Sequence, residues 1–531
     1  MEIQAGGARG PLPRVAGDPV EETHLAAPER WLWRPNLIVF ISNSCIMVLE
    51  LVAGRIIAPY VGVSLYTWTS IIGVVLAGIS LGNYLGGRLA DRLASLRLLG
   101  GIFVLGGLSS FGILAVDRLG GISGSGLSLV GQILIITTAL FFVPCVILGA
   151  ISPVVAKLAV RDLSRTGSTV GKIYAAGTIG SIVGTFATGF FLISWFGTHT
   201  IVWGVALILI TLGAVLLAGG RWHLVLLSTL ALTGGTIPAY NQGWLSGPCM
   251  RETNYFCIRV HEAEREGDVV RVLTLDRLVH SYTSLTNPTK LVYGYEQIYA
   301  ELARYQARDD HSLSALFIGG GGYTFPRYME AIYPESEIHV IEIDPGVTEV
   351  AHDLLGLDRD THIVTFNEDA RLYLEREPTQ LYSLVIGDAF DDFAVPYHLT
   401  THEFNQRVRA WLEHDGLYVV NVIDGPRGDF LRAYTHTLRQ SFRHVYLVPS
   451  IEPWRESPRS TFVLIAAQVP LDQGALEAVA PEAGESLLER QMLSQETVDA
   501  ILAEGRVVML TDRYAPVDQM LAPVFREEGP R

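Results

Sequence analysis

The chain has 531 residues and a mass of 58.1 kDa, which exceeds one ordinary hydrophobic core and predicts at least two domains. Apolar residues make up 49%, charged residues 18% and the mean hydropathy is +0.32, a composition that excludes a disordered or nucleic-acid-binding chain and disfavours a fully soluble one. The net charge of −15 is unevenly spread, because residues 36–241 hold ten Lys and Arg against four Asp and Glu. Two halves are therefore predicted, one apolar and slightly basic, the other acidic.

Residues 1–33 are predicted to form a disordered tail, since they are rich in Gly, Pro and acids and hold no apolar run typical of a cleavable signal peptide. A transmembrane helical domain, an all-α membrane bundle, is predicted over residues 34–241. About seven of its apolar stretches approach the roughly 20 residues that cross a bilayer, at 36–58, 66–87, 98–116, 128–157, 173–195, 199–218 and 223–240. The fourth stretch is overlong and carries Pro144 and Pro153, so a kink or a re-entrant break is expected there.

Small residues recur in this region at the spacing that lets helix backbones approach in lipid, Gly82 with Gly86 and Gly180 with Gly184. The segment GNYLGGRLADR at residues 82–92 resembles the loop between the second and third helices of major-facilitator transporters. Because this transporter-like resemblance covers one loop, a scaffold or an access route to the membrane is the preferred interpretation of the helical region.

Basic residues indicate the orientation of the helices. Most Lys and Arg fall in the turns after even-numbered stretches, at 88–97, 157–172 and 221, and few in the opposite turns. The positive-inside rule then places the N-terminus in the cytoplasm. With seven crossings, the sequence predicts an integral protein of the cytoplasmic membrane whose soluble domain is extracytoplasmic.

The soluble half is predicted to contain a small β-rich subdomain at 248–290 and an α/β domain at 291–531. A helix is expected near 291–305. Strands alternating with helices indicate a doubly wound, mostly parallel, Rossmann-like sheet, closed by an antiparallel pair. The expected strands lie within 315–322, 339–344, 363–370, 381–390 and 416–423, with the closing pair at 444–450 and 460–468.

Glycines and acids follow successive strands of this predicted sheet. Gly319, Gly320 and Gly321 allow a backbone turn to approach a ligand, and an acid about 20 residues on, here Glu342, can hold ribose hydroxyls. Asp369 and Asp388 stand at the ends of the next two strands. Together these residues predict a nucleoside site, whereas the alternative interpretation is that the acids are helix caps and turn formers.

The stretch 252–468 resembles spermidine synthase, the polyamine aminopropyltransferases, and most closely the bacterial membrane proteins in which such a domain follows transporter-like helices. The matching segments are LTLDRLVHS (273–281), YGYEQIY (293–299), FIGGGG (317–322), VIEIDP (340–345), EDAR (368–371), DAFDDFAVPYHLTTHEF (388–404) and LTDRYAPVDQML (510–521).

The resemblance implies a role for each acid. It makes Glu342 the ribose-binding acid of a nucleoside thioether or sulfonium and Asp369 the adenine-contacting acid. It makes Asp388 the catalytic aspartate and Asp391 the acid that holds the amine substrate. A carboxylate suits this reaction, because the attacking amine must lose a proton and be oriented, whereas a sulfonium leaving group needs no acid catalyst.

The chain also departs from the family pattern. The family's glycine motif carries an acid after its third glycine, where this chain has Gly322, and the family's glutamine in the β subdomain is His280 here. The nucleoside side is therefore better preserved than the propylamine side. The substrate-binding residues expected from the matching segments are His280, Tyr295, Gln297, Tyr323 and His398, the last being a second base or a loop contact.

Cys249 and Cys257 lie eight residues apart at the entry to the soluble half. A disulfide between them would fit an oxidising compartment, and two reduced cysteines in a β hairpin are the alternative. Cys45 and Cys145 lie within apolar stretches and are interpreted as core residues. No Cys or His cluster has zinc spacing, so no metal is predicted.

The leading functional hypothesis is a membrane-anchored aminopropyltransferase-like enzyme with Asp388 as base and decarboxylated S-adenosylmethionine or S-adenosylmethionine as the adenosyl sulfonium donor. A methyltransferase on the same fold is the second. Cofactor-free extracytoplasmic amine chemistry, such as N-terminal glutaminyl cyclisation, is the third, and a transporter with a ligand-sensing domain is the fourth. The expected partners are the lipid bilayer and a small-molecule or peptide amine, without nucleic acid, and a homo-oligomer is left open.

Overall fold

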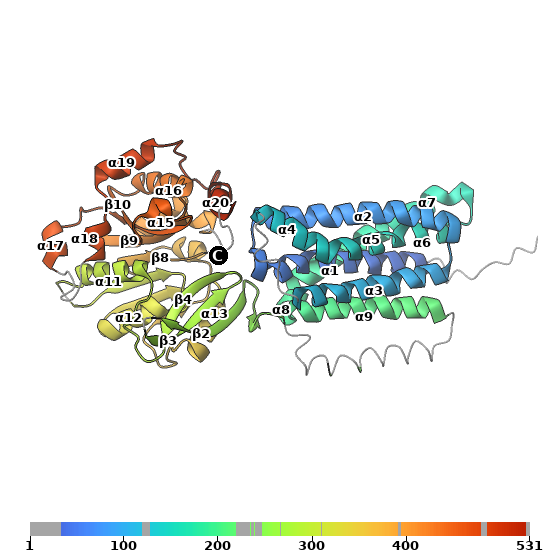
Figure 1. Cartoon of the computed structure of the whole chain (residues 1–531), viewed down its shortest axis with the longest axis horizontal. Coiled ribbons are helices and arrows are strands. Elements are labelled where there is room, and N and C mark those ends of the chain that lie inside the picture. Colours follow the sequence, from blue (N-terminus) through green and yellow to red (C-terminus); the bar gives the residue numbers. More distant parts are fainter. Residues whose placement is uncertain are drawn as a thin grey trace, which may run out of the picture.

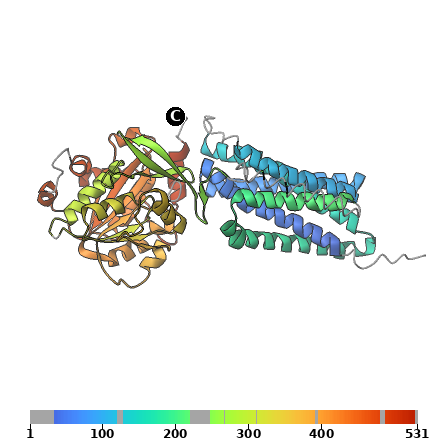
Figure 2. The same ribbon diagram turned by 90° about the horizontal axis from the view of Figure 1, so that it is seen from below.

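The computed structural model describes residues 33–118, 128–218, 247–265, 267–309, 311–390, 395–478 and 486–526, together with the isolated positions 234 and 238. Figure 1 shows a bundle of long helices lying side by side along the long axis of the molecule, with an α/β domain at one end of the bundle. Figure 2 gives the same arrangement from below. The two halves expected from the charge distribution are thus two separate bodies of the fold.

Six helices in the described part of the chain are long and apolar enough to cross a membrane. The fourth is interrupted by a π-helical turn and again at Ala150, as expected for the stretch with two prolines. The expected seventh stretch at 223–240 falls outside the described residues except for positions 234 and 238, and so does the tail except for Trp33. The segments are α1 (Trp33–Val61), α2 (Leu65–Leu93), α3 (Leu96–Arg118), α4–η2–α5–α6 (Leu129–Thr137, Thr138–Phe142, Val143–Gly149, Ile151–Ala159), η3–α7–η4–α8 (Leu163–Arg165, Thr166–Ala187, Thr188–Leu192, Ile193–Trp195) and α9 (Thr198–Ala218).

The glycine pairs singled out in the sequence are packing positions. A Cβ at Gly180 would lie 2.3 Å from the backbone oxygen of Phe40, and one at Gly184 would lie 2.6 Å from that of Ser44. The Ser44 hydroxyl also donates to the Gly180 carbonyl at 2.7 Å, so α1 and α7 touch through their backbones. Any larger residue at these two glycines would force the helices apart.

The α/β domain contains two sheets. Antiparallel strands β1 (Arg251–Glu252), β2 (Cys257–Arg265), β3 (Asp268–Leu275) and β4 (Leu278–Ser284) form the smaller sheet. The larger sheet has the order β10-β11-β9-β8-β5-β6-β7, parallel from β9 to β7 and closed by antiparallel β10 and β11. Each expected strand segment overlaps one of its strands: β5 (Ser314–Ile318), β6 (Glu337–Ile341), β7 (Val364–Phe366), β8 (Tyr382–Gly387), β9 (Leu412–Asp424), β10 (His444–Pro449) and β11 (Ser460–Ala467).

Helices cover both faces of the larger sheet, and an apolar core lies on each face. The alternation of strand and helix confirms the Rossmann-like α/β fold expected from the sequence. The helices and helical turns are α11 (Gly294–Gln306), α12 (Thr324–Ile332), α13 (Pro345–Leu354), α14 (Ala370–Leu374), η5 (Tyr397–Leu399), α15 (His402–Ala410), α16 (Asp429–Arg439), η6 (Trp454–Glu456), α17 (Gln473–Ala478), α18 (Leu487–Gln491), α19 (Gln495–Ala503) and α20 (Val517–Arg526).

The β1–β2 hairpin joins the two bodies. Arg55, near the end of α1, donates one hydrogen bond to the Asn254 carbonyl at 2.7 Å and another to the Thr253 carbonyl. The Glu252 carboxylate accepts from the backbone N–H of Thr198 at 2.8 Å and from its hydroxyl at 3.0 Å, which caps the first turn of α9. A Cys249–Cys257 disulfide, the pair expected from the sequence, closes the same hairpin.

Candidate active site

The glycine turn after β5 meets the end of β8 at the point where the strand order reverses. The Asp388 backbone N–H donates to the Ile318 carbonyl at 2.9 Å. Gly319 has φ +101, and a Cβ there would lie 2.4 Å from the Asp388 carbonyl oxygen, so this position requires glycine. In doubly wound sheets ligands bind in the crevice at this switch point.

A cavity opens at this point. Four polar atoms in its wall are buried and have no hydrogen-bond partner among the described residues: the Ser281 and Tyr299 hydroxyls, the Asn421 side-chain oxygen and Nε2 of His280. Ser281, Tyr299 and Asn421 are 4%, 1% and 4% exposed. Buried polar groups are normally paired, so atoms left unpaired around one cavity indicate a place for a polar ligand. The lining residues come from β4 (Leu278, Val279, His280, Ser281), α11 and its approach (Tyr293, Tyr295, Glu296, Tyr299), the glycine turn and α12 (Phe317, Gly319, Gly320, Gly321, Gly322, Thr324, Phe325, Pro326) and the ends of β8, β9 and β11 (Ile386, Asp388, Phe390, Asn421, Ile423, Arg459, Thr461).

Asp388 is one of two acids in the described lining of this cavity. Its Oδ1 accepts a hydrogen bond from the Asn421 side-chain amide at 2.9 Å. Burial raises the pKa of Asp388 to about 7, although the Asn421 bond acts in the opposite direction. A carboxylate whose pKa lies near neutral pH suits a general base, because it is both ionised and basic enough to take a proton.

Glu342, at the end of β6, organises the glycine turn. Its Oε2 accepts from the Gly320 and Gly321 backbone N–H groups at 2.8 and 3.3 Å, and its Oε1 accepts from Asp344 N–H at 2.9 Å. Glu342 is buried, and burial raises the pKa of its carboxyl while these N–H donors lower it. Oε1, which accepts a single bond, keeps acceptor capacity for a further donor such as a ribose hydroxyl.

Two of the expected substrate-binding residues line the cavity. The Tyr295 ring stacks on that of Tyr293, with centroids 5.1 Å apart, and meets the Tyr299 ring edge-on with centroids 5.5 Å apart. His280 donates through Nδ1 to the Leu278 carbonyl at 2.9 Å, and burial lowers the pKa of its imidazole to about 4. His280 is therefore neutral at physiological pH and offers Nε2 as an acceptor rather than a cation.

The other expected binding residues lie outside the cavity lining. The Tyr323 side chain is fully buried, with its hydroxyl 3.1 Å from the Thr348 hydroxyl oxygen and 3.2 Å from that of Thr365. The Gln297 amide donates to the Leu291 carbonyl at 3.2 Å, at the approach to α11. Asp391, expected to hold the amine, lies outside the described residues.

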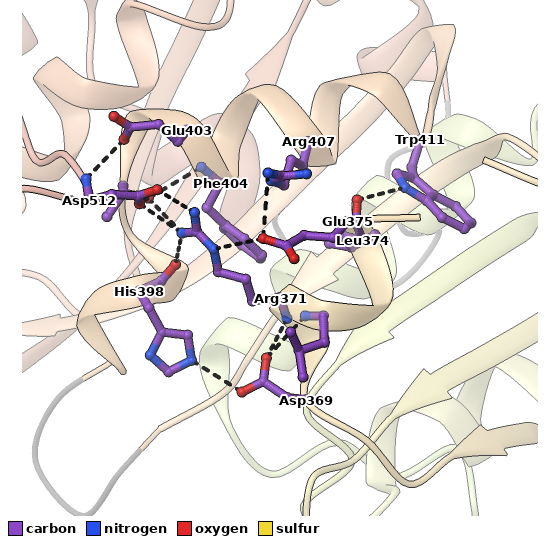
Figure 3. Close-up of polar contacts among 12 residues, drawn as sticks. Asp369, Arg371, Leu374, Glu375, His398, Glu403, Phe404, Arg407, Trp411 and Asp512 are labelled. Carbon is purple, nitrogen blue, oxygen red and sulfur yellow. Dashed lines mark hydrogen bonds and ion pairs between the residues drawn. The ribbon is translucent and has the colours of Figure 1, made fainter. Parts of the chain in front are cut away.

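Asp369 and His398 belong to a neighbouring polar cluster, shown in Figure 3. Oδ1 of Asp369 accepts from Arg371 N–H at 2.7 Å and caps α14, while Oδ2 lies 3.6 Å from Nε2 of His398. Arg371 reaches across to both carboxylate oxygens of Asp512 and to the His398 carbonyl. Asp369 thus serves as a helix cap, as the alternative interpretation of the acids states, and an adenine contact would be an additional role.

Gly322 has no room for the acid that the resemblance leads one to expect. A Cβ at this position would lie 1.9 Å from the Ser281 hydroxyl oxygen and 2.7 Å from the Ser281 Cβ. Replacement of Gly322 by Ala is therefore expected to destabilise the protein by about 1–3 kcal/mol through overpacking. Thermal unfolding of the full chain in detergent measures the loss, and the second change Ser281→Gly should restore most of it. An unchanged melting temperature for Gly322→Ala would contradict the fit.

Asn421 and Glu296 are among the wall residues that were not singled out from the sequence. Asn421 is one polar residue inside the apolar run GLYVVNVI, and that interruption of a buried strand was the available signal. Glu296 lies beside Tyr295 in a segment already singled out, but an acid near a helix start ordinarily indicates a cap rather than a site. Among the described residues, no group of three or more His, Cys, Asp or Glu is arranged to hold a metal ion.

Comparison with known proteins gives several polyamine aminopropyltransferases and also eEF1A lysine and N-terminal methyltransferases of Mus musculus and Bos taurus, although no protein-family model matches the chain. A polyamine aminopropyltransferase of Vibrio vulnificus is 27% identical over 213 residues, which are 38% of this chain and 68% of that protein. A polyamine aminopropyltransferase of Corynebacterium efficiens is 27% identical over 344 residues, 58% of this chain and 64% of that protein. The crystal structure of a probable spermidine synthase from Corynebacterium glutamicum aligns with 48% of this chain and 93% of its own, at 20% identity and a TM-score of 0.42.

Proposed function

Since the chain is a spermidine synthase-like protein, we propose that it is a membrane-anchored transferase that moves an aminopropyl group from decarboxylated S-adenosylmethionine to an amine, with Asp388 as general base. The observation that carries this proposal is the cavity at the β5–β8 switch point. It combines a glycine turn, a carboxyl with a pKa of about 7 and buried polar atoms that lack partners among the described residues.

The proposed reaction is one displacement. The lone pair of the amine nitrogen forms a bond to the propyl carbon next to the sulfonium, and the carbon–sulfur bond breaks with its electrons passing to sulfur. Methylthioadenosine leaves as a neutral thioether, and the proton of the attacking amine passes to Asp388. Asn421 positions the accepting carboxylate through its 2.9 Å hydrogen bond.

Glu342 and the glycine turn are the residues proposed to hold the nucleoside. The Gly320 and Gly321 N–H groups donate hydrogen bonds to Glu342, and these bonds fix the conformation of the glycine turn before a ligand binds. A preorganised turn lowers the cost of binding because no residue has to be ordered when the ligand arrives. The remaining acceptor capacity of Glu342, at Oε1, fits one hydroxyl of a ribose.

We further propose that the α/β domain is extracytoplasmic. Arg55 of α1 and Thr198 of α9 contact this domain, so the end of α2 and the start of α7 lie at the opposite end of the bundle. That far end holds the basic residues at 88–97 and 157–172, where Lys157 bonds Asp91 at 3.1 Å. The positive-inside rule assigns such an end to the cytoplasm.

The expected result for orientation is that a cysteine introduced at exposed Glu335 reacts with an impermeant maleimide in intact cells. A cysteine introduced at exposed Arg161, at the far end of the bundle, is the matched control and should react only after lysis. If the position-335 cysteine is protected until lysis while the position-161 cysteine is labelled in intact cells, the α/β domain faces the cytoplasm and the proposed orientation is wrong.

The same orientation favours a second candidate function, cofactor-free chemistry on an amine, because a sulfonium made in the cytosol would not reach an extracytoplasmic site. Intramolecular attack of an N-terminal amine, as in glutaminyl cyclisation, would also use Asp388 as base. Binding of methylthioadenosine distinguishes the two candidate functions. The transferase binds methylthioadenosine, whereas failure of this product to bind the purified protein, with the domain shown to face outside, would select the cofactor-free reaction.

A further inference from the structure

A chain of hydrogen bonds runs from the membrane helix α1 to the glycine turn of the candidate site. It begins at Arg55, which donates to the Asn254 carbonyl at 2.7 Å and also to the Thr253 carbonyl. Both carbonyls belong to the turn of the β1–β2 hairpin, which joins the bundle to the α/β domain. A cationic side chain of the bundle is therefore bonded directly to the soluble half of the molecule.

Thr253 continues the chain through its side chain. Its hydroxyl oxygen accepts from the Phe256 N–H at 2.9 Å and from the Tyr255 N–H at 3.1 Å. Its single proton has Oδ2 of Asp344 as the nearest acceptor, at 2.5 Å, with the Phe256 carbonyl farther away at 3.3 Å. The hairpin fits closely here, since a Cβ at Gly346 would lie 2.3 Å from the Thr253 methyl group.

Asp344 links the hairpin to Glu342. Its backbone N–H donates to Oε1 of Glu342 at 2.9 Å, and Oε2 of Glu342 holds the glycine turn. Asp344 is 1% exposed, and burial raises the pKa of its carboxyl, whereas the Thr253 bond and the charge of Arg55 lower it. A buried carboxylate needs such compensation to remain ionised. Arg55 and Thr253 thus hold Asp344 in place, and Asp344 holds the Glu342 carboxylate.

The hairpin also has a contact with the bundle that leads elsewhere. Each carboxylate oxygen of Glu252 accepts a bond from Thr198 of α9, one from its N–H and one from its hydroxyl. Glu252 therefore attaches the hairpin to the bundle, whereas the neighbouring Thr253 connects Arg55 with Asp344. These adjacent positions allow attachment of the hairpin and the path to Glu342 to be tested separately.

We propose that Arg55 is a positioning residue for nucleoside binding, acting through Thr253 and Asp344 on Glu342. This inference rests on the proposed nucleoside site and adds a residue of the membrane bundle to those that determine its affinity. The bundle then has a part in binding besides holding the domain at the membrane. By linkage, nucleoside binding favours the position of α1 in which Arg55 meets the hairpin.

The test is calorimetry with methylthioadenosine on the full chain in detergent. Arg55→Met keeps a long side chain without its donors, and Thr253→Val keeps the shape of the side chain without its hydroxyl. Each variant should bind about tenfold more weakly than the wild type, within the usual range of coupling between sites. The double variant should lose little more affinity than either single variant, because both changes interrupt one path.

Glu252→Gln is the matched control, because it alters the other hairpin contact, and it should bind methylthioadenosine like the wild type. Arg55→Lys keeps the charge near Asp344 and Thr253→Ser keeps the hydroxyl, so each should retain most of the affinity. In turnover, Arg55→Met should raise the KM for the donor more than it lowers kcat, because Asp388 is not a member of this chain of bonds. A merely structural loss would lower kcat through loss of folded protein.

Wild-type affinity in both Arg55→Met and Thr253→Val, with the wild type binding methylthioadenosine, would overturn this inference and leave the proposed function standing. Additive losses in the double variant, or an equal loss in Glu252→Gln, would also overturn it, because the residues would then act separately or through attachment of the hairpin alone. Thr253→Val decides the question if Arg55→Met does not fold. If the wild type does not bind methylthioadenosine, the proposed nucleoside site fails and the inference fails with it.

Discussion

Replacement of Asp388 by Asn is expected to lower turnover by a factor of about 10²–10⁴, the usual contribution of a general base. Asparagine keeps the size of the side chain and an oxygen that can accept the 2.9 Å bond from Asn421, so the fold should be preserved. Steady-state turnover on the identified amine measures the effect. Asp424→Asn is the matched control, because Asp424 is buried at the end of β9 and accepts from Gly425 and Leu431 N–H outside the cavity lining.

The pH dependence of kcat/KM tests the role of Asp388 independently. Because the pKa of Asp388 is raised to about 7, its carboxyl is protonated and inactive as a base below that pH. We therefore expect kcat/KM to rise with pH through about 7, rather than through the lower range of an ordinary aspartate. Removing the Asn421 bond, by Asn421→Leu, should move this rise to higher pH. Turnover of Asp388→Asn at the wild-type rate would remove Asp388 from the mechanism.

Replacement of Glu342 by Gln is expected to weaken methylthioadenosine binding by about a hundredfold. Glu342 accepts three backbone N–H bonds, and glutamine offers one oxygen while turning an amide donor toward another N–H. The loss of charge-assisted bonds at about 1.5–3 kcal/mol each accounts for an effect of this size. Calorimetry with methylthioadenosine measures it.

The control for Glu342 is Glu335→Gln, a substitution at an exposed position just before the same strand β6. This variant should bind methylthioadenosine like the wild type. Equal affinities for wild type and Glu342→Gln would show that the glycine turn keeps its shape without the carboxylate, and would leave Glu342 without a part in nucleoside binding.

Most of the fold could be predicted because its signals are local. Buried parallel strands appear as short apolar runs ended by glycine or an acid, and all seven expected segments overlap a strand of the larger sheet. The first six apolar stretches are likewise helices long enough to span a membrane. The contact of Arg55 with the β1–β2 hairpin could not be predicted, since it joins residues about 200 positions apart and depends on how the two bodies meet.

The site could be predicted in part. Gly319 and Asp388 follow from strand order, because the carboxyl ends of adjacent parallel strands meet at one edge. Glu296 and Asn421 needed the three-dimensional arrangement, since the importance of each depends on facing the same cavity. Tyr323 follows the glycines directly in the sequence, and it was expected to bind substrate. Its backbone is left-handed, with φ 54, and its side chain is buried outside the cavity lining.

The most direct test of the account is to incubate the purified full chain with decarboxylated S-adenosylmethionine and an amine such as putrescine, and to analyse the products by mass spectrometry. The account predicts methylthioadenosine and an aminopropylated amine in equal amounts, with little product from Asp388→Asn. Methylated amine and S-adenosylhomocysteine formed from S-adenosylmethionine would instead indicate a methyltransferase. Absence of methylthioadenosine from the wild-type reaction with a range of amines would contradict aminopropyl transfer.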